Sequence, residues 1–344
     1  MSESNVVGKQ GQFSRRRFLG TGLAVAGGAA AAGLLPSVLD AAPAGASSLT
    51  PLTFQLSWVK DAEFAGTFLA DKNGYFTKNG LAVNILAGGA SVVPEPVVVS
   101  GKALIAVSAA DAVAQANAQG ADLKIIGVRY QKNPFCIISL ADKPIKSPEG
   151  LYGKKLGVSS ANQNAWTTFV KVANIDVSKI TIVPVQFDPT PLATGEVDAW
   201  MGFTTSEPGE LAVKGVKTYQ FLFADFGYSI YSDLYEVTSE TLATKEKELV
   251  AFMKAEKAGW IYDINHIAVG TKVSLEYAES SGLTEAQQLL ENKSQMPLIL
   301  TPYTKKHGIF TMNPADIAAN IKTLATAGIK ADPSMFSDKI VSQI

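Results

Sequence analysis

Three amide side chains stand together in the segment Asn162-Gln163-Asn164, just before Trp166. The sequence predicts a helix over 162–173, so these amides open it. They present fixed hydrogen-bond donors and acceptors, which suit a heterocycle with ring nitrogens and carbonyls. Capping the helix is a sufficient role for one amide, but three exceed what a cap requires. Asn162, Asn164 and Trp166 are therefore candidate ligand-binding residues.

Trp58 and Glu63 lie between the first predicted strand and the first predicted helix. An indole offers a large flat face to a ring, and a carboxylate near a helix start accepts hydrogen bonds. Two structural roles remain open, because Trp58 could pack the core and Glu63 could complete the helix start. We keep both residues as ligand-binding candidates.

The inventory of catalytic groups is small. One cysteine, Cys136, lies in the apolar run 135–138, and the two histidines are His266 and His307. Neither histidine belongs to an HxxxH or HExxH motif, and no GxSxG, P-loop or GxGxxG motif is present. A cysteine in an apolar run is typical of a buried strand residue. The sequence predicts neither an enzyme nor a metal site nor a cofactor.

The charge balance argues against nucleic acid as a partner. Thirty Lys and Arg residues face 31 Asp and Glu residues, which gives a net charge of -1. Phosphate binding needs clustered Lys and Arg. Beyond residue 17 the only arginine is Arg129, and Lys60 is the nearest lysine to Trp58. Few positively charged side chains are therefore available to bind an anionic ligand.

The first 46 residues have the order of a signal peptide. Three arginines precede Phe18-Leu19, an uncharged stretch follows over 20–35, and small residues fill 41–46. The arginines with Phe18-Leu19 resemble a twin-arginine export signal. A lipid anchor would need a cysteine at the cleavage site, and none precedes Cys136. We expect an exported, periplasmic protein without stable membrane insertion.

Short β-branched runs alternate with amphipathic stretches, which is typical of α/β layers. This alternation predicts parallel sheets with ligand sites beyond the carboxyl ends of the strands. The alternation restarts after 142–150, a segment whose proline and glycine residues are typical of turns, and the last third of the chain is helical. The expected strands are 52–56, 81–86, 103–107, 123–128, 155–158, 180–185, 197–201 and 218–223, and the expected helices are 63–72, 111–119, 162–173, 245–262 and 284–292.

Several segments together resemble one family, the solute-binding proteins of the thiamine-precursor and riboflavin group, to which nitrate, sulfonate and taurine binders are more distantly related. The resemblance covers most of 52–259. The segments that carry it are Gln55-Leu56-Ser57-Trp58, Glu63-Phe64-Ala65-Gly66, Asn73-Gly74-Tyr75-Phe76, Asn79-Gly80-Leu81, Leu151-Tyr152-Gly153-Lys154-Lys155-Leu156-Gly157-Val158 and Gly195-Glu196-Val197-Asp198-Ala199-Trp200 with Glu207.

The resemblance implies a type II periplasmic-binding-protein fold, in which two α/β lobes joined by two crossover strands close on a ligand. The first lobe would hold 52–139 and 237–344, and the second lobe 140–236. The crossovers would lie near 136–140 and 234–237. The implied partners are a small-molecule ligand and a cognate ABC permease with its ATPase, and we expect a monomer.

The resemblance also implies a role for Glu207, which would pair with an aminopyrimidine edge between aromatic faces such as Trp200 and Phe203. The rival interpretation is a helix N-terminal acid before Pro208, favoured by the helix dipole.

Weaker candidates come from other strand ends. Ser108, Asp111 and Tyr130 follow strands of the first lobe. Tyr228 lies near the return crossover and could close over a ring, although tyrosines in such places are often simply half-buried. Gly88-Gly89 suggests an anion-binding turn or, more simply, a plain turn.

These observations favour a binder of a flat heteroaromatic nutrient, either a thiamine pyrimidine precursor or a riboflavin-like molecule. A binder of nitrate, a sulfonate or taurine is the first alternative, and an adaptor for a protein partner is another. A fungal enzyme of the same fold makes the thiamine pyrimidine with a cysteine-rich motif and a reactive histidine. This chain has neither feature.

Overall fold

The computed structural model describes residues 49–278 and 282–344. The predicted signal peptide, 1–46, lies outside the described residues. Within them, no helix combines the length and the apolar character that crossing a bilayer requires.

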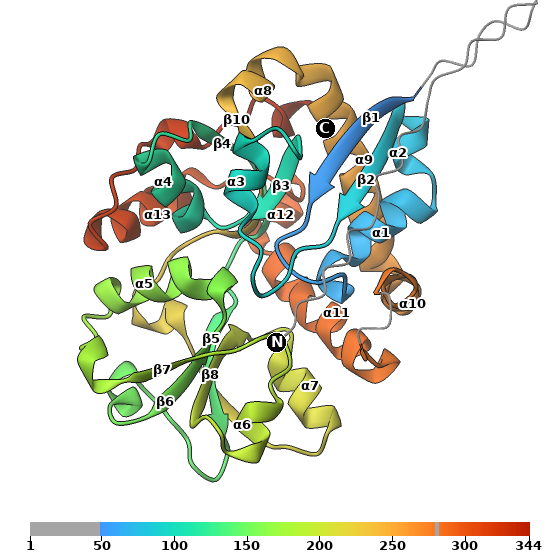
Figure 1. Ribbon diagram of the computed structural model, residues 1–344. Coiled ribbons are helices and arrows are strands. Elements are labelled where there is room, and N and C mark those ends of the chain that lie inside the picture. The colour runs from blue at the N-terminus through green and yellow to red at the C-terminus, as the bar shows by residue number, and fades with distance from the viewer. Residues whose placement is uncertain (1–48, 279–281) are drawn as a thin grey trace, which may run out of the picture. The chain divides into compact units, whose positions relative to one another are not determined.

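The first sheet has five strands in the order β2-β1-β3-β10-β4 (Figure 1). β1 pairs in parallel with β2 and β3, whereas β10 runs antiparallel to both β3 and β4. The expectation of a wholly parallel sheet is therefore wrong, because a strand from much later in the chain separates β3 from β4. The bounds are β1 (Thr50–Gln55), β2 (Leu81–Leu86), β3 (Ile105–Ser108), β4 (Leu123–Tyr130) and β10 (Ser232–Thr238).

The second sheet repeats this plan in the order β7-β6-β8-β5-β9. β6 pairs in parallel with β7 and β8, and β5 is inserted antiparallel between β8 and β9. This sheet is therefore mixed as well. The bounds are β5 (Phe135–Leu140), β6 (Lys155–Val158), β7 (Thr181–Pro184), β8 (Ala199–Phe203) and β9 (Thr218–Leu222).

The chain passes from one sheet to the other at 131–134 and returns at 223–231. The sequence placed these passages later, near 136–140 and 234–237. β5 belongs wholly to the second sheet and β10 wholly to the first. Local hydrophobicity shows that such a segment is a strand but not which sheet it joins.

Helices connect the strands, and the chain is helical after β10. The α-helices are α1 (Ala65–Lys72), α2 (Tyr75–Lys78), α3 (Pro94–Val99), α4 (Ala110–Ala118), α5 (Gln163–Val172), α6 (Thr190–Thr194), α7 (Glu207–Val213), α8 (Ser239–Thr244), α9 (Glu246–Asn265), α10 (Ile267–Tyr277), α11 (Glu285–Ile299), α12 (Pro302–His307) and α13 (Pro314–Thr326). The short 3-10 helices are η1 (Ala62–Phe64), η2 (Pro148–Leu151), η3 (Ser160–Asn162), η4 (Val177–Lys179), η5 (Phe223–Phe226), η6 (Pro333–Met335) and η7 (Val341–Gln343).

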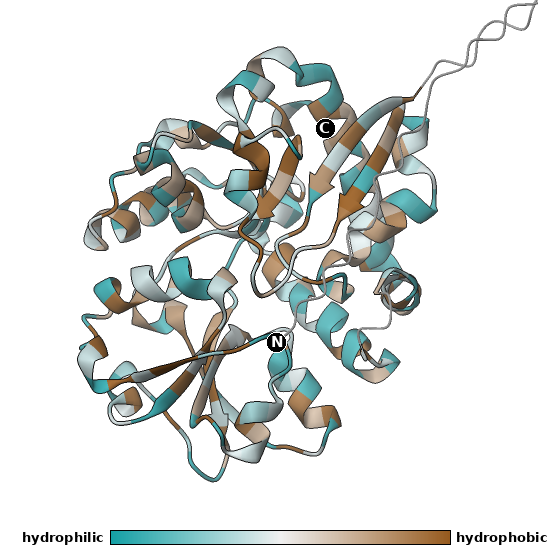
Figure 2. Ribbon diagram, viewed as in Figure 1, coloured by the Kyte–Doolittle hydropathy of each residue, from teal (hydrophilic) through white to brown (hydrophobic). Residues whose placement is uncertain are grey.

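Apolar residues lie along the strands of both sheets and on the helices that pack against them (Figure 2). On one face of the first sheet, α1 and α9 pack closely because glycines meet at their contact. A side chain at Gly66 would collide with Trp260, and one at Gly259 would collide with the Gly66 backbone. This packing fixes α1 and with it η1, the 3-10 turn that carries Glu63.

Candidate ligand-binding site

A pocket opens where residues of the two sheets face each other. Its volume is about 790 Å³ when the part open to solvent is counted. Small-molecule sites combine an apolar lining with a few placed polar groups. Residues from both sheets line it, so a bound molecule would contact both.

Topology brings the polar residues of the first sheet to one edge. Ser57, Trp58 and Glu63 follow the carboxyl end of β1, and Ser108 ends β3, which is parallel to β1. Asp233 lies near the start of β10, and β10 runs antiparallel to β3, so its amino end reaches the same edge. This arrangement follows the rule that open α/β sheets bind ligands beyond their strand ends.

The second sheet supplies the opposite wall. Phe203 ends β8, and Phe135 begins the antiparallel strand β5 directly opposite it, with the two rings 4.6 Å apart in edge contact. Asn162 and Asn164 contribute from the start of α5, and Glu207 from the first turn of α7. Aromatic and amide groups therefore share this wall.

Glu207 is held by two neutral N–H donors. Its Oε2 accepts from the Phe203 backbone N–H at 2.8 Å, and its Oε1 accepts from the Trp200 indole N–H at 3.4 Å. The carboxyl group packs over Gly202, where a side chain would occupy the same space. Burial raises the pKa of Glu207 to about 7. Near neutral pH this group therefore exists in both protonation states, next to the pocket.

The first-sheet wall is organised around one buried cation. The Arg129 guanidinium pairs with Asp233, and its Nη2 lies 3.8 Å from Glu63 Oε1. It also stacks on Trp260 at 4.6 Å and on Tyr130 at 4.9 Å from the ring centres. The adjacent carboxylates raise the pKa of Arg129, so the group stays charged despite its burial. Arg129 does not line the pocket.

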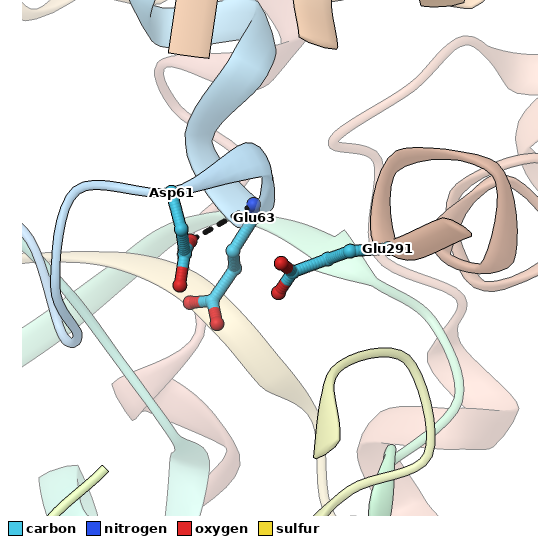
Figure 3. A group of neighbouring side chains, drawn as sticks. All are labelled: Asp61, Glu63 and Glu291. Carbon is cyan, nitrogen blue, oxygen red and sulfur yellow. Dashed lines mark hydrogen bonds between the residues drawn. The ribbon is translucent and has the colours of Figure 1, made fainter. Parts of the chain in front are cut away.

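Two more carboxyl groups, those of Asp61 and Glu291, converge on Glu63 beside Arg129. Asp61, Glu63 and Glu291 place one oxygen each within 4.8 Å of the others (Figure 3). The Glu63 backbone N–H donates to Asp61 Oδ1 at 3.0 Å, and Gln288 Nε2 donates to Glu291 Oε2 at 2.9 Å. Burial raises the pKa of Asp61 to about 8 and those of Glu63 and Glu291 well above their ordinary value.

These three carboxyl groups offer the oxygen ligands that Mg²⁺, Ca²⁺ or Mn²⁺ prefer. A cation there would, however, lie beside the Arg129 guanidinium, which is already 3.8 Å from Glu63. The raised pKa values describe the alternative, in which protons shared among the carboxyl groups neutralise the cluster. Burial and mutual repulsion therefore favour a proton within the cluster, and the adjacent guanidinium disfavours a metal ion there.

Glu95 is a further lining residue that the sequence did not indicate. It lies in the first turn of α3 and accepts a hydrogen bond from the Ser108 hydroxyl. Asp111, at the start of α4, lines the same part of the pocket and accepts from the Tyr228 hydroxyl at 2.8 Å and from the Ala112 backbone N–H at 3.0 Å. Burial raises the pKa of both acids.

Most of the predicted ligand-binding residues share this pocket, although no ligand tests their role. Those that line it are Trp58, Glu63, Ser108, Asn162, Asn164, Phe203 and Glu207.

The other three predicted residues lie outside the lining. Tyr130 is buried, and its hydroxyl donates to Gln295 Oε1 at 2.7 Å. Trp166 is on the buried face of α5, against Phe169. Tyr228 is buried and reaches the pocket only through its bond to Asp111. A strand end or a helix start places a residue near the cleft, but the direction of its side chain depends on tertiary packing.

The Gly88-Gly89 turn is explained by close packing. The Gly88 N–H donates to the Trp58 carbonyl at 2.8 Å, so it is already used within the protein. A side chain at Gly88 would lie 2.5 Å from the Leu56 carbonyl oxygen. The structure therefore agrees with a plain turn, and this turn sets the path of the chain that leads to Glu95.

The family model described as "NMT1/THI5 like" matches residues 61–267, which is more than half of the chain. A protein of Haemophilus influenzae whose name assigns it to thiamine biosynthesis is 26% identical over 69% of this chain and 77% of its own length. A formylaminopyrimidine-binding protein of Halalkalibacterium halodurans is 24% identical over 76% and 81%. The riboflavin-binding protein RibY of Chloroflexus aurantiacus is 23% identical over 78% of each chain.

Solved structures share the fold at lower identity. The alkanesulfonate-binding protein SsuA from Xanthomonas axonopodis pv. citri, bound to MOPS, has a TM-score of 0.59 and 14% identity over 87% of this chain and 99% of that one. The desulfurization enzyme DSZB has a TM-score of 0.52 and 13% identity over 86% and 98%. Binding proteins and an enzyme therefore use the same architecture, and the pocket must decide the function.

Proposed function

Because this chain belongs to the NMT1/THI5-like family, we propose that it is a solute-binding protein of an ABC importer that captures a small heteroaromatic nutrient. The ligand would be a thiamine pyrimidine precursor or a riboflavin-like molecule. Two relatives are named for such ligands, formylaminopyrimidine and riboflavin. The two walls of the pocket would close on the ligand, which a permease and its ATPase would then receive.

The observation that carries this proposal is the chemistry of the lining. Five carboxyl residues line the pocket, and none of the lining residues is Lys, Arg or His. A carboxylate accepts hydrogen bonds, so the lining favours a ligand rich in N–H donors. Glu207 lies beside the half-buried ring of Phe203, where it could accept from the amino edge of a flat ring.

An anionic ligand fits this lining poorly, although one structural neighbour binds alkanesulfonates. Sulfonate recognition calls for Arg, Lys or several N–H groups aimed at the anion. Arg129 is committed to Asp233 and Glu63 behind the pocket wall. The anion binder therefore stays the second candidate, favoured by the shared fold alone.

We propose binding rather than catalysis. Cys136 is buried on β5, and burial raises the pKa of its thiol, which keeps it from acting as a nucleophile. His266 and His307 lie at the ends of α9 and α12 and do not line the pocket. The proposal also includes export by the twin-arginine route, a periplasmic location and a monomeric state.

The first test is a panel of ligands measured by thermal shift on the purified protein. The panel holds hydroxymethylpyrimidine, its formylated amino analogue, thiamine, riboflavin, taurine, an alkanesulfonate, nitrate and bicarbonate. A ligand at about 100 times its Kd stabilises a protein by roughly 2.7 kcal/mol, a shift of a few degrees. Stabilisation by anions alone would contradict the proposal. If no ligand in the panel stabilised the protein, the alternative of an adaptor that binds a protein partner would be favoured.

A further inference from the structure

The lining carboxyl groups differ in how far their charge is already compensated. Glu63 and Asp233 face the Arg129 guanidinium. Asp111 accepts from the Tyr228 hydroxyl and from a backbone N–H. All three are therefore supplied with partners inside the protein. A charged group that keeps its internal partner gains less from a ligand, because forming the new contact means sharing or breaking the old one.

Glu207 is an intermediate case, since two N–H donors hold it and both are neutral. Glu95 is the least compensated of the five. Its carboxyl group accepts hydrogen bonds from the Ser108 hydroxyl and from its own backbone N–H. Among the described residues, Glu95 forms no ion pair. Its exposed fraction is only 4%. A carboxylate removed from water in this way depends on a partner.

A second buried acid lies behind Glu95. Glu236 is on β10 opposite Ala106 of β3, two residues from Ser108 and on the same face of the sheet. This face lies under α3, which packs against both strands and carries Glu95. Glu236 is 0% exposed, and neither of its carboxyl oxygens has a hydrogen-bond partner. Burial and the nearby Glu95 raise the pKa of Glu236 well above its ordinary value, so Glu236 favours its neutral form and Glu95 is the acid that lines the pocket here.

We propose that the solute carries a positive charge and places it against Glu95. This inference rests on the proposed function and narrows its ligand to cationic rings, such as an amidinium, a protonated aminopyrimidine or a ring with an ammonium arm. The cation would form an ion pair with Glu95 and a hydrogen bond from its N–H, in a pocket whose lining supplies no competing positive charge. Such a pocket concentrates cations and repels anions.

The geometry adds a constraint on the shape of the solute. Glu95 is carried by the first-sheet side of the pocket and Glu207 by the second-sheet side. A solute that contacts both needs donors at two separate places on its frame. Its cationic group would approach Glu95, and a neutral N–H edge would approach Glu207, where the acid already has its own neutral donors.

Three probes of matched shape test the charge directly: benzamidine, benzamide and benzoate carry one positive, no and one negative charge on the same ring. Their affinities for the full chain are measured by calorimetry or by ligand-observed NMR. A charge-assisted hydrogen bond implies that benzamidine binds at least about tenfold tighter than benzamide. Benzoate should not compete with either. Equal or weaker binding of benzamidine would overturn the inference.

Two variants test whether the positive charge of the ligand binds at Glu95. Glu95→Gln should reduce the benzamidine-to-benzamide ratio to about one, whereas Glu236→Gln, which replaces a buried acid that favours its neutral form and does not line the pocket, should leave the ratio nearly unchanged. Glu149→Gln is the matched control, because Glu149 also follows a proline in the first turn of a helix but is exposed. A ratio that survives Glu95→Gln in a folded protein would overturn the assignment to Glu95.

The outcomes also separate this inference from the proposed function. If riboflavin binds and benzamidine does not, the heteroaromatic importer stands and the positive charge is wrong. If no member of the ligand panel and no probe binds, both are contradicted. If Glu95→Gln does not fold, the three-probe ratio in the natural sequence still decides whether the solute carries a positive charge.

Discussion

The two walls of the pocket hold their acids in different ways. On the first-sheet wall, Asp233 is paired with the guanidinium of Arg129, which also lies 3.8 Å from Glu63, and burial raises the pKa of Glu63. On the second-sheet wall, Glu207 is held by neutral N–H donors, those of Phe203 and Trp200 among them. The first arrangement is complete without a ligand, so it stabilises the protein. The second leaves a negative charge that a ligand can use, so it is suited to recognition.

The largest expected effect comes from removing the cation. Arg129→Met leaves Asp233 and Glu63 buried without their partner, and we expect a loss of about 3–5 kcal/mol of unfolding free energy. Chemical denaturation measures it. Lys124→Met, on the same strand, is the control and should cost well under that amount, because Lys124 is only half-buried and its Nζ donates to the Ser334 carbonyl rather than to a buried acid.

A double variant sharpens this test. Adding Asp233→Asn to Arg129→Met removes one of the stranded charges and should recover part of the loss, which a double-mutant cycle measures. If Arg129→Met lowered the unfolding free energy by less than about 1 kcal/mol, the ion pair would not stabilise the first-sheet wall, and the two walls would not differ in how they hold their acids.

The pH dependence of stability is the next largest effect. Burial raises the pKa of Glu207 to about 7 from an ordinary 4.5, so the native state holds a proton that the unfolded chain releases. The stabilisation is therefore complete below pH 4.5 and is lost as the pH rises through 7. One such group accounts for about 3 kcal/mol at most. Tm should fall between pH 5 and pH 8.

Glu207→Gln should flatten part of that fall, and Glu196→Gln, an exposed acid in the loop before β8, should leave it unchanged. Asp61, Glu256 and Asp263 also have raised pKa values, so a residual slope is expected in the Glu207 variant. Identical profiles for the natural protein and Glu207→Gln would show that Glu207 stays ionised throughout.

Local pattern was enough to predict individual strands. The predictions 81–86 and 155–158 coincide with β2 and β6, because each is a β-rich run bounded by glycine or polar residues. Pairing was not predictable in the same way. β5 and β10 each run antiparallel inside an otherwise parallel sheet, and α10, α12 and α13 were not located. Which sheet a strand joins depends on contacts far apart in the sequence.

Part of the candidate site was predictable from sequence motifs. Trp58, Asn164 and Glu207 were indicated by residue type and by the family resemblance, and all three line the pocket. Glu95 was not, because its position depends on how the chain after β2 packs against the β1 loop at Gly88. Asp233 was missed because nothing local indicates that the amino end of β10 reaches the strand ends of β1 and β3. Its backbone has φ of 49°, a conformation unusual for a residue with a side chain.

The difference between the walls also predicts unequal effects on binding. Glu207→Gln should weaken a pyrimidine ligand by about 1.5–3 kcal/mol, the usual size for a hydrogen bond to a charged group. Glu63→Gln should change the affinity less, because burial raises the pKa of Glu63 and its carboxyl group already has Arg129 as a neighbour inside the protein. Calorimetry with hydroxymethylpyrimidine measures both. If Glu63→Gln had the larger effect, the roles of the two walls would be reversed.

The smallest expected effect on stability concerns the aromatic face of the first-sheet wall. Trp58 is half-buried and lines the pocket, whereas Trp166 is buried outside the lining. Trp58→Ala should therefore abolish most ligand binding and lower the unfolding free energy by only about 1 kcal/mol. Trp166→Ala is the opposite control, since it removes a buried ring and should lower Tm strongly. Equally large losses of Tm in both variants would assign Trp58 to the core and remove it from the site.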